Sequence, residues 1–258
     1  MFPGRHRSWI SSAAISTIKW NGTLFAKPQT MNNKHIYLIS GLGADERVFR
    51  NLVFPEGYTV HYLPWIKPLS PDESISDYAA RLARRIVHAN PVLLGLSFGG
   101  MMCIEIARQM PVEKVILLSS VKHRGELPPW YNNLARLLLR RLPDKLLFSR
   151  RRFVVRLFMQ TSTSEEKQLL EDYLSRKDYS YTRWALGAVL HWQNEWVPPG
   201  CVHIHGSSDR PFPRRYVSPT HTIVKGGHFM VMNRAAEISR ILERELLSLQ
   251  GPAVAAGV

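Results

Sequence analysis

The chain has 258 residues, and 45% of them are hydrophobic, so it can bury a core of domain size and is not a disordered chain. It has no apolar run long enough to cross a bilayer, and its two cysteines, Cys103 and Cys201, exclude a disulfide scaffold. Its formal charge of +14, from 34 Lys and Arg against 20 Asp and Glu, comes without a nucleic-acid recognition motif, so we expect no nucleic-acid partner.

Residues 1–30 differ in composition from the rest of the chain. They are basic, rich in Ser and Thr, and free of acidic residues, which resembles a targeting peptide without a clear amphipathic pattern. The alternative is that Met31 is the natural start and that the preceding residues are an upstream extension. We favour this second interpretation and expect a cytoplasmic protein in which residues 1–33 are a poorly ordered extension.

From residue 34 onwards the pattern alternates between strands and helices. Four short apolar runs bounded by turn residues predict strands, at 35–40, 58–63, 92–96 and 114–120. Asp45 suits the first turn of a short helix, Asp72 or Ser74 can cap a helix that runs to about His88, and another helix is predicted at 98–109. This alternation predicts an α/β fold, with a mostly parallel sheet and helices on both of its faces.

The alternation stops between residues 121 and 197. This segment has no convincing strand and is rich in aromatic residues, and its pattern predicts four helices, at 130–142, 150–159, 164–176 and 181–192. Residues 121–160 hold ten Lys or Arg against two acidic residues, which indicates a solvated basic face or, alternatively, weak contact with an anionic surface or substrate. We interpret 121–197 as a helical cap or lid.

Strand signals resume after this insertion. Strands are predicted at 201–206 and 220–224, and an amphipathic helix follows from about Asn233 to Ser248. Residues 34–120 and 198–250 are therefore expected to form one core, with the cap inserted between them. The small residues at 251–258 predict a flexible tail.

A candidate nucleophile lies between the strand at 92–96 and the helix that follows it. The sequence there is Gly95-Leu96-Ser97-Phe98-Gly99, and a strand that turns abruptly into a helix needs small residues on both sides of the turn. The pattern alone is weak, because many such sequences are ordinary loops. The flanking strand and helix make it more specific, and they predict that the Ser97 hydroxyl is held at the tip of a tight turn.

Two polar residues that follow later strands are candidate partners for Ser97. Asp209 follows the strand at 201–206, and His228 follows the strand at 220–224 behind two glycines. The carboxyl ends of parallel strands meet at one crevice, so these loops should converge. Asp209 could instead be an ordinary turn residue, and His228 an ordinary packed histidine. Glu126 is a weaker rival for the acid, and His203 and His205 lie within a strand.

Four motifs in chain order resemble the α/β-hydrolase family from about residue 34 to 250. They are Ser40-Gly41-Leu42-Gly43, Gly95 to Gly99, His205-Gly206-Ser207-Ser208-Asp209, and Gly226-Gly227-His228-Phe229. The resemblance implies that Ser97 is the nucleophile, His228 the base and Asp209 the orienting carboxylate. It also implies an oxyanion hole made by the backbone N–H groups of Leu42 and Phe98. Many members have His-Gly where this chain has Ser40-Gly41, which changes the hydrogen bonding expected in that loop.

The resemblance implies a serine hydrolase that cleaves a carboxylic ester, thioester or small amide through an acyl-enzyme on Ser97. The aromatic insertion indicates an apolar acyl or alkyl substrate, with Trp130, Trp184 and His191 as candidate contacts. No metal and no organic cofactor are expected. Two alternatives stay open: an acyltransferase or lyase on the same fold, and a small-ligand binding protein or receptor with little turnover.

Overall fold

The computed structural model describes residues 33–131, 133–143 and 151–249. The extension expected at 1–33 lies outside these residues except for Asn33, and the tail expected at 251–258 lies wholly outside them. Within the described residues the chain forms a six-stranded, entirely parallel sheet in the order β2-β1-β3-β4-β5-β6. The strands are β1 (Lys34–Ile39), β2 (Tyr58–Tyr62), β3 (Val92–Leu96), β4 (Lys114–Leu118), β5 (Val202–Gly206) and β6 (His221–Ile223).

Burial explains why the central strands are continuous apolar runs. Every residue of β3 is buried, because helices cover both faces of a parallel sheet. Successive residues alternate between the two faces, so Leu93 packs into one hydrophobic cluster and Leu94 into the other. The predicted α/β fold with helices on both faces of a parallel sheet is confirmed.

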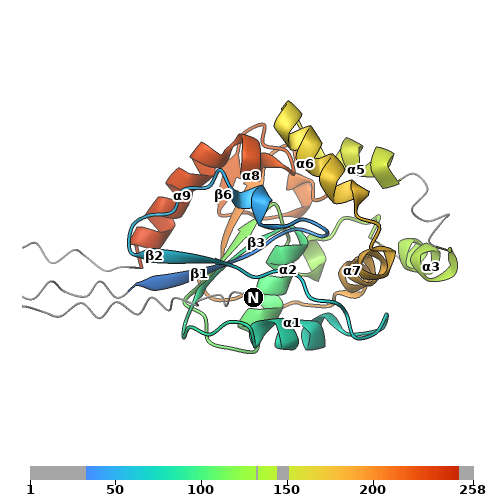
Figure 1. The fold of residues 1–258 in the computed structure, drawn as a ribbon, viewed down its shortest axis with the longest axis horizontal. Helices are drawn as coiled ribbons and strands as arrows, with labels where there is room; N and C mark the ends of the chain where they lie inside the picture. The colour runs from blue at the N-terminus through green and yellow to red at the C-terminus, as the bar shows by residue number, and fades with distance from the viewer. Residues whose placement is uncertain (1–32, 132, 144–150, 250–258) are drawn as a thin grey trace, which may run out of the picture. The chain divides into compact units, whose positions relative to one another are not determined.

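The two clusters belong to different helices. Helices α1 (Ile75–Ala83) and α2 (Phe98–Ala107) cover one face, and α9 (Ala235–Leu247) with the short α8 (Met230–Asn233) covers the other (Figure 1). Helix α2 is buried along almost its whole length, from Phe98 to Ile106. It is therefore a fixed element behind Ser97.

Two predicted helices differ in their limits. The helix expected to run to about His88 begins as predicted, with Ser74 as its cap, but ends at Ala83. The chain turns there so that Ile86 is buried and the Val87 N–H donates to the Tyr37 hydroxyl at 3.2 Å. The last predicted helix is α9, which begins at Ala235 instead of about Asn233, and the short α8 precedes it.

Within the described residues, four α-helices lie between β4 and β5 in the segment that was expected to form a cap, and we call them the cap helices, or the cap. They are α3 (Asn133–Arg141), α5 (Arg151–Met159), α6 (Ser164–Ser175) and α7 (Tyr179–His191). Figure 1 shows them gathered to one side of the sheet. Thr163 and Glu166 form a reciprocal capping box at the start of α6, and Asp178 caps α7. Three 3-10 turns complete the described structure: η1 (Glu46–Phe49), η2 (Arg124–Glu126) and η3 (Arg214–Tyr216).

The two cysteines are free. Cys103 is buried in α2, and burial raises the pKa of its thiol. Cys201 is half-buried before β5, where burial raises its pKa to about 12. Among the described helices, none is both long enough and apolar enough to cross a membrane.

Candidate active site

Ser97 lies in a strained turn between β3 and α2. Its backbone angles are φ 54° and ψ −118°, a region that residues other than glycine rarely adopt. The turn is held by the Ser97 N–H, which donates to Leu118 O at 2.9 Å, and by the Ser120 hydroxyl, which donates to Ser97 O at 2.7 Å. The sharp turn expected from the sequence is present.

Two glycines make this turn sterically feasible. A Cβ at Gly95 would lie 2.3 Å from Gly99 O, and a Cβ at Gly99 would lie 2.2 Å from Ile39 O. Both neighbours are backbone atoms, which cannot move aside as a flexible side chain could. The close approach of β3, α2 and β1 therefore requires glycine at both positions.

Asp209, His228 and Ser97 form one hydrogen-bonded chain. His228 Nε2 lies 3.0 Å from Ser97 Oγ, and His228 Nδ1 lies 2.8 Å from Asp209 Oδ2. Asp209 is buried, and its other oxygen accepts the Phe212 N–H at 2.9 Å. Because an ionised carboxylate can only accept, His228 donates from Nδ1, which leaves Nε2 as the acceptor for the Ser97 hydroxyl. The structure thus brings together the three residues expected to form a triad.

The residues considered as alternatives to Asp209 and His228 have other hydrogen-bond partners. Glu126 is buried, but it accepts the N–H groups of Lys122 at 2.7 Å and Ser218 at 2.9 Å. His205, on β5, donates from Nε2 to Phe212 O at 2.7 Å, and its Nδ1 accepts from His203 Nε2 at 3.1 Å.

His205 supports the acid loop, a role that the sequence analysis missed. Burial lowers the pKa of His205 and, more strongly, that of His203, which favours neutral imidazoles behind Asp209. His205 holds the carbonyl of Phe212, the residue whose N–H donates to Asp209. The only sequence signal for this role is that His205 lies in a predicted strand, two residues after His203.

The loop after β1 places Leu42 beside Ser97. Among the described residues, no hydrogen bond uses the Leu42 N–H. This chain has Ser40-Gly41 where many α/β hydrolases have His-Gly. The Ser40 hydroxyl donates to Ala44 O at 2.8 Å and accepts from Trp65 Nε1 at 3.1 Å. A side-chain hydroxyl therefore fixes the loop. Leu42 and Phe98 both line the cavity at Ser97, where their N–H groups could bind an oxyanion.

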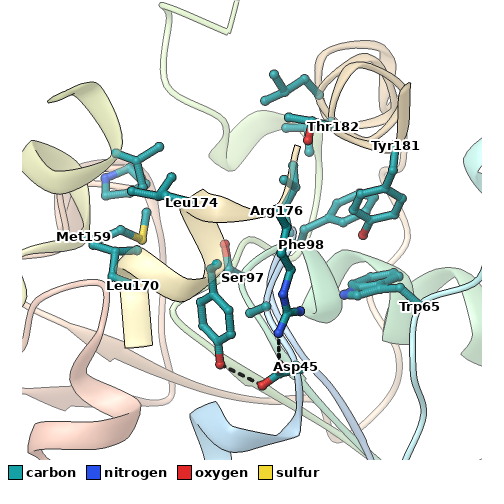
Figure 2. Close-up of a pocket in the computed structure, with 18 of the residues that line it drawn as sticks. Asp45, Trp65, Ser97, Phe98, Met159, Leu170, Leu174, Arg176, Tyr181 and Thr182 are labelled. Carbon is teal, nitrogen blue, oxygen red and sulfur yellow. Dashed lines mark hydrogen bonds and ion pairs between the residues drawn. The ribbon is translucent and has the colours of Figure 1, made fainter. Parts of the chain in front are cut away.

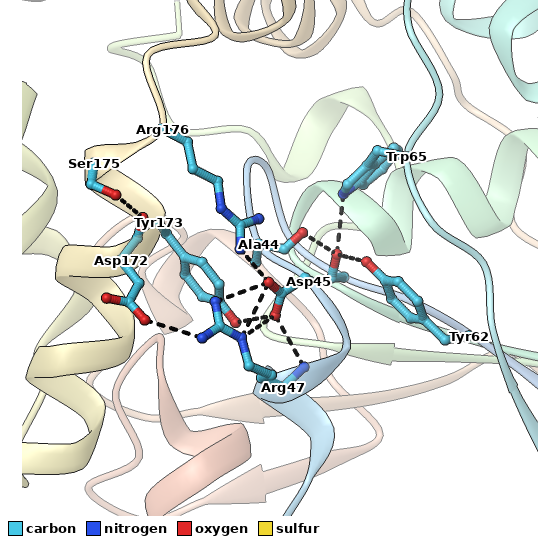
Figure 3. A network of polar contacts seen from close by, with 10 residues as sticks. Ala44, Asp45, Arg47, Tyr62, Trp65, Asp172, Tyr173, Ser175 and Arg176 are labelled. Atoms are coloured by element: carbon cyan, nitrogen blue, oxygen red, sulfur yellow. Dashed lines mark hydrogen bonds and ion pairs between the residues drawn. The ribbon is translucent and has the colours of Figure 1, made fainter.

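Asp45, in the same loop, joins the loop to the cap (Figure 3). It caps η1 as expected, and its carboxylate also accepts from Arg47 Nε at 3.0 Å, from the Tyr173 hydroxyl at 3.0 Å and from Arg176. Burial alone would raise the pKa of Asp45, but the hydrogen bonds from Arg47, Arg176 and Tyr173 outweigh it and lower the pKa to about 2. The sequence indicated that Asp45 caps a helix, but it did not indicate the contacts of Asp45 with α6.

A cavity of about 1040 Å³ lies over Ser97 and His228, between the sheet and the cap. Figure 2 shows Met159, Leu170 and Leu174 on one side of Ser97, and Trp65 and Tyr181 on the other. The first group belongs to α5 and α6. The Trp65 ring packs on Phe98 with centroids 5.2 Å apart and on Tyr181 at 6.0 Å. The volume suits a sizeable ligand, and both sides offer apolar surface.

Of the three substrate contacts predicted in the cap, only Trp130 lines this cavity. Trp184 is buried in the core instead, where its ring stacks on Tyr78 with centroids 4.1 Å apart and its N–H donates to Glu73 O at 2.9 Å. His191 is exposed at the end of α7 and bonds to Gly187 O of its own helix. The predictions for Trp184 and His191 are therefore corrected: their side chains lie on the faces of α7 that do not form the cavity wall.

The sequence profile of the Alpha/beta hydrolase family matches residues 36–241. The chain therefore belongs to the α/β-hydrolase family. No curated protein matches its sequence significantly.

Solved structures share the fold at low sequence identity. The enol-lactonase from Burkholderia xenovorans has a TM-score of 0.64 and 16% identity, over 84% of this chain and 92% of that one. MenH from S. aureus has a TM-score of 0.63 and 18% identity, over 88% and 98%. A lipase-esterase related protein from Clostridium acetobutylicum has a TM-score of 0.60 and 16% identity, over 82% and 93%. These similarities establish the fold and do not identify the chemistry.

Proposed function

We propose that this α/β hydrolase cleaves a carboxylic ester, or a thioester or small amide, through an acyl-enzyme on Ser97. The observation that carries the proposal is the hydrogen-bonded chain Asp209–His228–Ser97 at the floor of a large apolar cavity. A serine hydroxyl becomes an effective nucleophile only when a base can take its proton as it attacks, and His228 Nε2 is within reach to do so.

Acylation follows from these contacts. Ser97 Oγ attacks the carbonyl carbon while His228 Nε2 accepts the hydroxyl proton. Buried Asp209 keeps the imidazole in its tautomer and stabilises the imidazolium that forms. The oxygen of the tetrahedral intermediate becomes negative within reach of the Leu42 and Phe98 N–H groups, at the positive end of α2. His228 then protonates the leaving alcohol, thiol or amine, and the acyl group stays on Ser97.

Deacylation repeats the sequence with water as the nucleophile. His228 removes a proton from water, the hydroxide oxygen attacks the acyl carbon, and the proton returns to Ser97 Oγ as the acid leaves. The same site would transfer the acyl group to an alcohol or amine if such an acceptor displaced water. Hydrolysis is the simpler outcome, because it needs no second binding site.

The cavity supports a substrate with apolar groups. Its walls carry aliphatic side chains from α5 and α6 and aromatic side chains on Trp65, Phe98 and Tyr181. Enclosing an apolar chain contributes about 0.8 kcal/mol for each methylene removed from water. We therefore expect kcat/KM to rise with acyl chain length until the chain fills the cavity.

A fluorophosphonate probe and a series of p-nitrophenyl esters from acetate to laurate test the proposal. The parent protein should be labelled and should hydrolyse the esters, and Ser97→Ala should lose both properties. Ser218→Ala is the matched control, because Ser218 is exposed and its substitution should leave both unchanged.

Two outcomes would contradict the proposal. Labelling that survives Ser97→Ala would place the nucleophile elsewhere. Labelling at Ser97 without release of free acid, but with transfer to an added alcohol, would favour an acyltransferase over a hydrolase.

A further inference from the structure

Three histidines lie together on one face of β1 and β2, outside the proposed active site. His35 lies near the amino end of β1, His61 lies on the neighbouring edge strand β2, and His88 follows α1. The register pairs Tyr37 with His61, so His35, Tyr37 and His61 occupy one face of the sheet. None of the three histidines lines the cavity at Ser97, so this cluster takes no part in the chemistry proposed above.

The three imidazoles are close enough to converge on one metal ion. One ring nitrogen from each lies within 4.8 Å of the others, and among the described residues no other group of His, Cys, Asp or Glu meets this condition. His35 Nδ1 and His61 Nε2 are 3.0 Å apart, close to the roughly 3.3 Å between two nitrogens bound to one tetrahedral Zn²⁺. All three side chains are half-buried, so the cluster is open to an ion from solvent.

The hydrogen bond between His35 and His61 is a contact that a bound cation can replace. At least one nitrogen of the His35–His61 pair must be unprotonated, because one proton serves both. A divalent ion would replace the shared proton and use these lone pairs together.

His88 also has the outer contact typical of a ligating imidazole. Its Nδ1 lies 2.7 Å from the Tyr37 hydroxyl oxygen, which in turn accepts the Val87 N–H. Nε2 can bind an ion when Nδ1 carries the proton and donates it to the Tyr37 oxygen. The His88 ring stacks on His35 with centroids 3.4 Å apart, so chelation would turn it out of that stack.

We propose that His35, His61 and His88 form a binding site for a divalent transition-metal ion of the Zn²⁺ type, completed by water. Imidazole suits Zn²⁺, Cu²⁺ and Ni²⁺ in preference to Mg²⁺ or Ca²⁺. The ion would join the edge strand β2, the neighbouring β1 and the turn after α1. Its effect would be on the stability of the fold, because an ion that binds only the folded chain raises the melting temperature.

Zn²⁺ titration of the full chain by calorimetry, with Co²⁺ as a spectroscopic substitute, tests the proposal. We expect one equivalent to bind, a rise in Tm with Zn²⁺, and visible Co²⁺ absorption bands of a low-coordinate nitrogen site. His61→Asn and His88→Ala, made separately, should each weaken binding by at least about tenfold. Tyr37→Phe keeps the ring and removes only the outer hydroxyl, so it should weaken binding by about tenfold.

His191→Asn is the control, because His191 is exposed and bonds only within its own helix. Circular dichroism without metal shows whether each variant is folded before its affinity is compared. The proposal is overturned if the parent shows no saturable binding at one equivalent. It is also overturned if His61→Asn and His88→Ala, both folded, bind Zn²⁺ as tightly as the His191→Asn control.

Discussion

The two walls of the cavity are built in different ways. The sheet wall is held by backbone contacts and buried groups: Ser97 hydrogen-bonds to Leu118 O, Gly99 lies against the carbonyl of Ile39, and Asp209 is enclosed. The cap wall is held to the sheet by side-chain contacts. Some are buried, such as Trp184 on Tyr78, and others lie at its margin, such as Arg176, whose side chain is 48% exposed in its pair with Asp45. Reacting groups need fixed geometry, whereas ligand-binding surfaces tolerate change. Substitutions should therefore have large effects on the sheet wall and small effects at the exposed positions of the cap wall.

The largest expected effect concerns Asp209. Asp209→Asn keeps the shape of the side chain but removes the charge that fixes the His228 tautomer, and kcat should fall by about 10⁴-fold with an unchanged fold. Steady-state ester hydrolysis measures this. Asp172→Asn, at an exposed acid on α6, is the matched control and should retain most of the parent activity. Near-parental turnover in Asp209→Asn would mean that another group orients the base.

Two glycine substitutions compare packing in the two regions. A methyl group at Gly99 would meet backbone atoms of β1, so Gly99→Ala should cost about 3 kcal/mol or more of folding free energy. Gly187 lies within α7 and has only ordinary contact with Leu139 at 3.7 Å, so Gly187→Ala should stabilise the protein by about 0.5–1 kcal/mol. Urea unfolding measures both changes. Equal changes in unfolding free energy at Gly99 and Gly187 would contradict the proposed difference in packing between the two regions.

A smaller effect is expected from Arg176→Met. Its pair with Asp45 is partly exposed, and such pairs contribute about 0.2–1 kcal/mol, so Tm should hardly change. Because Arg176 also lines the cavity, kcat/KM should change by no more than about fivefold, mainly through KM. Arg176→Lys retains the charge, so its kcat/KM should lie closer to that of the parent than the value for Arg176→Met. A loss of several orders of magnitude in kcat would place Arg176 among the reacting groups.

A further expected effect is a dependence of stability on pH through Asp45. The pKa of Asp45 is lowered from its ordinary 3.8 to about 2, so the folded state favours the ionised form. Its contribution to stability is present above the ordinary value and is lost as the pH falls through about 2. The difference in unfolding free energy between the parent and Asp45→Asn should therefore shrink between about pH 4 and pH 2. A difference in unfolding free energy that stays constant across this pH range would contradict the lowered pKa of Asp45.

The sequence predicted the sheet and the serine turn because both depend on local signals. Buried parallel strands must be apolar runs, and the turn at Ser97 requires glycines at fixed positions. The convergence of Asp209 and His228 could be inferred from strand polarity alone. The early end of α1 could not be predicted from local signals. The residues that follow the helix are stabilised by Tyr37, which lies 50 residues before Val87 in the chain.

The cap contacts were harder to predict for the same reason. A helix pattern shows that α7 has a buried face, but not whether Trp184 on that face meets the cavity or the core. It meets Tyr78 and Glu73, residues of a distant segment. Likewise, the His35, His61 and His88 cluster joins three segments without any motif spacing, so only the folded structure reveals it.

The protonation of the two cysteines has a practical consequence for studying movement of the cap. With Cys103 buried and the pKa of Cys201 near 12, almost no thiolate is present at neutral pH, so maleimides should react slowly with the parent protein. An introduced thiol such as Phe153→Cys, at an exposed position of α5, could then carry a fluorophore without removing either native cysteine. Its emission would report cap motion while the sheet wall stays unmodified.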